Sequence, residues 1–160
     1  MFGFKDKYKK KAESLIFLAN TTALGSTSLY DHFPILYNIV EDDRTLIFIM
    51  TIVGVGVGIT LIDDEVSENE FMKFSYAIAD ELKNWDSQGY NPYGREGAYK
   101  AYTDLANFIR GKEAEAYFVG VGFWLVTNIK GSHASKEEII VGTAISKMIA
   151  TSLFGWWNKV

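Results

Sequence analysis

The strongest constraint on the fold is an uncharged run of eighteen residues at 45–62, TLIFIMTIVGVGVGITLI, of which eleven are Leu, Ile, Phe or Val. So much apolar surface must be buried in a protein core or in a membrane. Its three glycines each disfavour a helix by about 1 kcal/mol, and its β-branched residues favour a strand. Eighteen residues is nevertheless long for a strand. We therefore predict a buried central helix, with a buried strand as the alternative.

The flanks of this run do not have the pattern of a membrane span. Residues 41–43 and 63–65 are all acidic, Arg44 is the one basic residue, and neither end carries a Trp. Spans usually have Lys or Arg on one side and aromatic belts at the interfaces. A second apolar run, at 115–129, has the length of a buried core element. We expect a cytoplasmic protein, with a small membrane-associated helical protein as the alternative.

Helical signals dominate the rest of the chain. Apolar residues recur at 71, 74, 78, 82 and 85, the spacing of one helix face. Capping boxes, Ser67 with Glu70 and Ser135 with Glu138, mark two helix starts. We predict a single all-α domain over 1–160, a bundle of about six helices. The alternative is an α+β fold with buried strands at 45–62 and 115–129.

The two halves of the chain share a pattern. The sequence Val-Gly-Val-Gly occurs at 55–58 and again at 119–122, and each copy is followed by one of the capping boxes. This indicates possible repeat units at 41–85 and 112–155, each an apolar helix, a polar turn and a capped helix. A chance likeness of two Val/Gly-rich runs is the alternative.

Composition narrows the function. The chain has no cysteine and two histidines, which excludes disulfide scaffolds, thiol catalysis and Cys-ligated metals. The net charge of −4 argues against a nucleic-acid partner. No nucleophile, acid–base pair or cofactor loop is evident. We expect a non-catalytic helical interaction protein, although an enzyme whose groups converge only in space stays possible.

Five carboxylates follow the central run within eight residues, and they are candidate metal ligands: Asp63, Asp64, Glu65, Glu68 and Glu70. Ca²⁺ and Mg²⁺ prefer clustered carboxylate oxygens. The alternative is that these acids are solvated and complement the positive end of the next helix.

The same stretch resembles the TerB-like tellurite-resistance helical domains over residues 45–85. Their turn reads D-G-x-[IV]-[ST]-x-x-E, and the matching residues are Asp63, Val66, Ser67 and Glu70. Asp64 stands where the family has glycine, and the second repeat has no carboxylate at the equivalent place. The resemblance implies an all-α, stress-related protein with an acidic face that binds divalent metal.

Tyrosines gather around an arginine in and after the loop at 87–97. Tyr and Arg are frequent at binding hot spots. The candidate binding set therefore includes these residues and His133 from a second loop: Tyr90, Tyr93, Arg95, Tyr99, Tyr102 and His133. The alternative is an ordered helix connection whose rings cover the edge of the core.

The last helix has apolar residues on more than one face and ends in an aromatic tip. A surface helix needs only one apolar stripe, and monomers rarely expose such patches. We predict a homodimer whose interface includes Leu153, Phe154, Trp156 and Trp157. The alternative is that this helix is itself central and the tip folds back on the core.

Overall fold

The computed structural model describes residues 2–87 and 97–160, and the side chains of 7–26, 28–85 and 97–160. Its long helices are α1 (Phe2–Leu24), α4 (Asp43–Ile62), α5 (Glu68–Ser87), α6 (Ala98–Ile109), α7 (Ala114–Lys130) and α8 (Lys136–Leu153). Short helical segments are η1 (Gly25–Ser28), α2 (Leu29–His32), α3 (Leu36–Ile39) and α9 (Trp156–Lys159). These ranges contain no strand. The all-α prediction is confirmed, and the α+β alternative is wrong because both apolar runs lie in helices.

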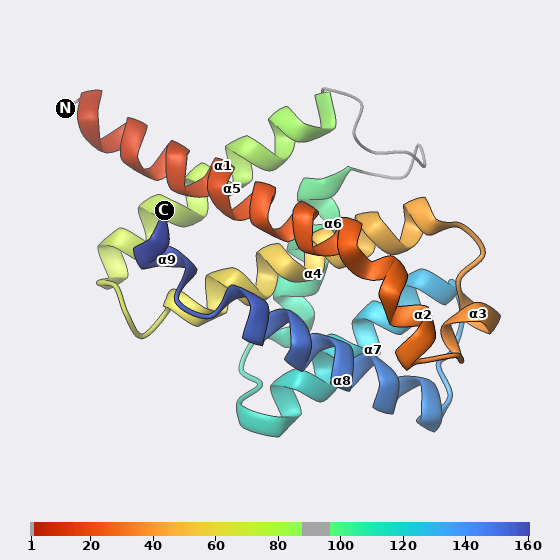
Figure 1. Cartoon of the computed structure of the whole chain (residues 1–160). Helices are drawn as coiled ribbons and strands as arrows, with labels where there is room; N and C mark the ends of the chain where they lie inside the picture. Colours follow the sequence, from red (N-terminus) through yellow and green to blue (C-terminus); the bar gives the residue numbers. More distant parts are fainter. Residues whose placement is uncertain (1, 88–96) are drawn as a thin grey trace.

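Helix α4 is the centre of the bundle. It packs against α1, α6, α7 and α8, and the other helices surround it (Figure 1). Every residue from 48 to 59 is buried. Burial on all sides explains why this helix has no polar face. The 45–62 run is therefore the core element that the sequence predicted.

Glycines let the neighbouring helices approach α4 closely. A Cβ atom on Gly54 would lie 2.7 Å from the Cβ of Ala19 on α1, and one on Gly56 would lie 2.7 Å from Leu105 on α6. A Cβ on Gly58 would overlap Leu15. Packing on these faces stabilises the helix and compensates for the low helix propensity of glycine.

The contact between α7 and α8 is closer still. A Cβ atom on Gly122 would overlap the backbone at Gly142 and Thr143, and one on Gly142 would overlap the carbonyl of Gly122. The two helix backbones therefore touch at a pair of glycines. Ser146 adds a hydrogen bond of 3.1 Å from its hydroxyl to the carbonyl of Phe118 on α7.

The two proposed repeat units share their order of elements but pack differently. Each contains an apolar helix, a turn and a Ser-capped helix: α4 then α5, and α7 then α8. The second pair packs together along its length, whereas α5 packs chiefly on α1 and α6. The pseudo-symmetric packing expected of a duplication is absent from the described helices.

Two segments of the described chain are long and apolar enough to cross a membrane. They are Asp43–Ile62, with a mean hydropathy of 2.5, and Lys136–Lys159, with 1.4. In the first, 78% of the most apolar window is buried inside the protein. The core helix of a soluble protein passes the same test, so length and hydropathy alone do not assign a span.

Candidate functional site

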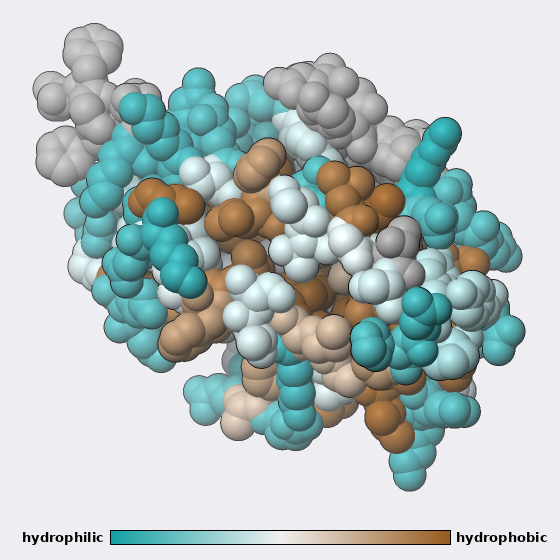
Figure 2. Space-filling view, viewed as in Figure 1, coloured by the Kyte–Doolittle hydropathy of each residue, from teal (hydrophilic) through white to brown (hydrophobic). Residues whose placement is uncertain are grey.

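The outward face of α8 is the clearest candidate interaction surface. Its inner residues pack on α4 and α7, while Glu137, Ile140, Ala144, Lys147 and Met148 recur on the opposite side of the helix. The side chain of Ile140 is 61% exposed and that of Met148 is 43% exposed. Figure 2 shows hydrophobic side chains across the face of the molecule that α8 and α1 present.

The neighbouring helix α7 extends this surface. A groove of about 580 Å³ lies between the two helices, and its wall includes Val119, Ile140 and Ala144. Lys147 Nζ forms an ion pair of 2.8 Å with Glu115 across the groove. We call the outward residues Glu137, Ile140, Ala144, Lys147 and Met148 of α8, together with Val119 of α7, the α8 surface.

A buried acid fixes the start of α8. The carboxylate of Glu138 accepts hydrogen bonds from Lys130 Nζ at 2.8 Å and from the backbone N–H of Ser135 at 3.2 Å. The Ser135 hydroxyl accepts one from the backbone N–H of Glu138, which completes the predicted capping box. The Lys130 bond, more than any other contact, holds the pKa of Glu138 below its usual value. The α8 surface therefore begins at a well-ordered turn.

The aromatic end of the chain is covered by the protein itself, which corrects the predicted interface. Leu153, Trp156 and Trp157 are buried, because the chain after α8 folds back over α4 and α5. The indole of Trp157 also lies 4.7 Å from Lys11 Nζ, which hydrogen-bonds to the carbonyl of Trp157. Of the four predicted residues only Phe154, 72% exposed, is open to a partner.

The acidic turn at 63–70 does not form a metal cluster. Ser67 caps α5 as predicted, accepting from the backbone N–H of Glu70 at 3.1 Å. The Glu70 carboxylate instead binds Lys7 Nζ at 3.0 Å and Tyr8 Oη at 3.3 Å. Asp63, Asp64, Glu65 and Glu68 are exposed. Within the described ranges no group of three His, Asp or Glu residues could hold a metal, so the predicted Ca²⁺ or Mg²⁺ site has no support in the geometry.

The predicted tyrosine site is only partly within the described residues. Tyr90, Tyr93 and Arg95 lie outside them. Tyr99 is packed beneath Lys83 Nζ, 4.6 Å from its ring centroid, and Tyr102 is half-buried, which raises its pKa to about 12. His133 is exposed in the loop between α7 and α8, and this loop lies apart from the start of α6 (Figure 1). The candidate binding set is therefore not one site.

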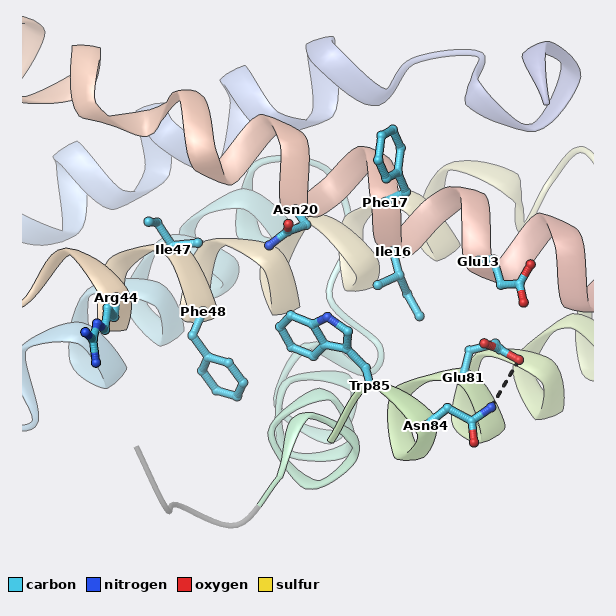
Figure 3. A pocket seen from close by; sticks show the side chains of 10 residues that line it. All are labelled: Glu13, Ile16, Phe17, Asn20, Arg44, Ile47, Phe48, Glu81, Asn84 and Trp85. Atoms are coloured by element: carbon cyan, nitrogen blue, oxygen red, sulfur yellow. Dashed lines mark hydrogen bonds between the residues drawn. The ribbon is translucent and has the colours of Figure 1, made fainter. Parts of the chain in front are cut away.

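Sequence reasoning missed a groove between α1, α4 and α5. It has a volume of about 490 Å³, an aromatic floor that includes Phe48 and Trp85, and charged residues at both ends (Figure 3). Its walls come from three helices that are distant in the sequence, so no local motif marks it. The one signal in the sequence was the helical spacing of residues 78, 82 and 85, which placed Trp85 on the inner face of α5.

Comparisons with known proteins give no family for this chain. No protein-family model, no curated protein and no solved structure matches it. The TerB-like resemblance of residues 45–85 therefore stays a prediction from the sequence.

Proposed function

We propose that this protein is a non-catalytic helical interaction protein that self-associates through the α8 surface. The observation that carries the proposal is the apolar stripe of Ile140, Ala144 and Met148, flanked by one acid and one base. Apolar side chains that recur on the outward face of a helix are typical of a helix-to-helix interface. Closed two-fold dimers are the commonest form of self-association.

The stripe is complementary to itself when two copies of α8 pack antiparallel. With the two-fold axis level with Gly142, Ile140 of one copy lies opposite the small Ala144 of the other. In the same register Glu137 lies opposite Lys147, so two ion pairs form. Antiparallel packing also opposes the two helix dipoles favourably. The contact is small among specific interfaces, and we expect a dissociation constant in the micromolar range.

A charge exchange tests this arrangement. Glu137→Lys and Lys147→Glu should each weaken the dimer, because each places like charges opposite one another. The double variant should restore the dimer. The intramolecular bond of Lys147 to Glu115 is exposed and contributes little stability, so each single variant should stay folded.

Sedimentation equilibrium across the micromolar range is the measurement. Ile140→Asp should give a monomer, while the matched control Met72→Asp, at a 51% exposed position on α5, should not change the association. A wild-type protein that stays monomeric throughout this range contradicts the proposal. So does a double charge exchange that fails to recover the dimer.

We infer a cytoplasmic location for the same protein. The burial of α4 by four neighbouring helices supports this inference, since protein already covers the apolar surface that a membrane span would expose to lipid. Recovery of the full chain from the detergent-free fraction of a cell lysate is the expected result. Recovery only after detergent extraction would favour the membrane-associated alternative.

A further inference from the structure

The groove between α1, α4 and α5 results from the way these helices diverge. Helices α1 and α5 run in the same direction and are joined near their starts by the ion pair of Lys7 with Glu70. They separate toward the end of α5, and α4 lies beneath the gap (Figure 1). Ile16, Phe48 and Trp85 form an apolar floor there, in which the rings of Phe48 and Trp85 stack with centroids 5.9 Å apart.

One end of the groove is acidic. Glu13 of α1 and Glu81 of α5 face this end, and Asn84 Nδ2 lies 3.4 Å from a carboxylate oxygen of Glu81 (Figure 3). Burial, and then the charge of Glu13, raise the pKa of Glu81. Lys9 reaches Glu13 at 3.9 Å and balances only part of this charge. A cation bound at this end would relieve the repulsion between the two carboxylates.

The opposite end of the groove is basic. Arg44, in the first turn of α4, lies at the far end from Glu13 in Figure 3. Among the described residues it has no ion-pair partner. An exposed guanidinium beside an apolar floor is suited to binding a carboxylate in two-pronged geometry.

Helix geometry gives the length of a ligand that reaches both ends. Asn20 of α1 hydrogen-bonds to Thr51 of the antiparallel α4, so these positions are level. Glu13 and Arg44 each lie seven residues away on opposite sides, which separates their backbones by about 20 Å at 1.5 Å per residue. After allowance for the two side chains, the ligand spans about 13–17 Å, the length of four or five extended residues.

We propose that this groove binds a short apolar peptide in an extended conformation, with its free ammonium at Glu13 and Glu81 and its free carboxylate at Arg44. The charge order of the groove matches the two ends of such a peptide. Its side chains would cover the apolar floor formed by Phe48 and Trp85. No residue of the α8 surface lines the groove, so the test of peptide binding is independent of the test of self-association.

Isothermal titration with the tetrapeptide Leu-Ala-Leu-Ala tests the proposal. We expect the free peptide to bind, and both its N-acetylated and its C-amidated forms to bind at least about tenfold more weakly, because each loses one charge-assisted contact. The double variant Glu13→Gln with Glu81→Gln should remove the preference for the free amine and keep that for the free carboxylate. Arg44→Gln should remove the preference for the free carboxylate and keep that for the free amine. Glu65→Gln, at an exposed acid of the turn after α4, is the matched control and should leave the affinity unchanged.

Three results would overturn the proposal. Equal affinity for the free and blocked peptides would show that the charged ends are not recognised. If none of the three peptide forms binds, the groove is not a peptide site. Binding of 11-aminoundecanoate without binding of the tetrapeptide would assign the groove to a small zwitterion instead.

Discussion

Trp156 Nε1 donates a hydrogen bond of 2.8 Å to the carbonyl oxygen of Gly58, a residue 98 positions earlier in the chain. The rings of Trp156 and Trp157 lie 5.6 and 5.1 Å from that of Phe74 on α5. The end of the chain thus joins two helices that have few direct contacts with each other.

Replacement of this anchor should destabilise the protein strongly. Trp156→Ala leaves a large cavity and is expected to lower the free energy of unfolding by about 3–5 kcal/mol. Trp156→Phe keeps most of the volume and should lose less. Urea denaturation followed by far-UV circular dichroism is the measurement, with Phe154→Ala as the control that changes stability little, because its side chain is 72% exposed. Equal effects of Trp156→Ala and Phe154→Ala would contradict the buried placement.

The glycine pair between α7 and α8 should tolerate no side chain. Gly122→Ala places a methyl group in the backbone of α8, and overpacking of this kind costs about 1–3 kcal/mol or more. Gly25→Ala is the matched control, because no atom lies within 4 Å of the added Cβ. Thermal melts of both variants are the test. A Gly122→Ala protein as stable as the wild type would mean that the two helices are farther apart than described.

The bonded carboxylate of Glu138 should make stability depend on acid pH. The folded-state pKa of Glu138 lies below the ordinary 4.5. The stability that its carboxylate contributes is therefore present above pH 4.5 and is lost as pH falls through the folded-state pKa. Glu138→Gln should lower stability at neutral pH by about 2 kcal/mol through loss of the charge-assisted bond. It should also flatten the acid limb of the profile. Denaturation series between pH 2 and pH 7 measure both effects, and parallel profiles for the two proteins would count against the buried bond to Lys130.

Tyr102 should make stability depend on alkaline pH. Burial raises its pKa from 10.0 to about 12, so the neutral phenol is favoured in the folded protein. The stability that the neutral phenol contributes is fully present below pH 10. It is lost as pH rises toward 12, because Tyr102 ionises at a lower pH in the unfolded chain than in the folded protein. Tyr102→Phe should therefore lose less stability across that interval than the wild type. Tyr76→Phe, at a 68% exposed position on α5, is the control, and the same alkaline slope in all three proteins would disprove this role of burial.

Local patterns were sufficient to predict individual helices. The 3–4 spacing in α5 placed Phe74, Ile78 and Leu82 inward, and all three are fully buried. The Ser135 capping box marked the start of α8 and forms both of its hydrogen bonds. These features depend on residues only a few positions apart, so the sequence displays them directly.

Contacts between residues that are far apart in the sequence could not be predicted from local patterns. Trp156 was expected at a partner interface because its hydrophobicity indicates burial but does not say against what. Glu70 was expected near a metal, and it bonds instead to Lys7, which precedes it by 63 positions. The groove with Glu13, Arg44 and Trp85 depends on the angle between three helices, which no local spacing encodes.

The glycines of α4 also determine how this helix exchanges its amide hydrogens. Three glycines and a β-branched sequence make the isolated segment a poor helix, so its helical hydrogen bonds persist only while α1, α6, α7 and α8 enclose it. Partial opening therefore cannot release α4 alone. Its amides from 48 to 59 should exchange with deuterium only when the whole protein unfolds, and their common exchange rate would report the global stability of the fold.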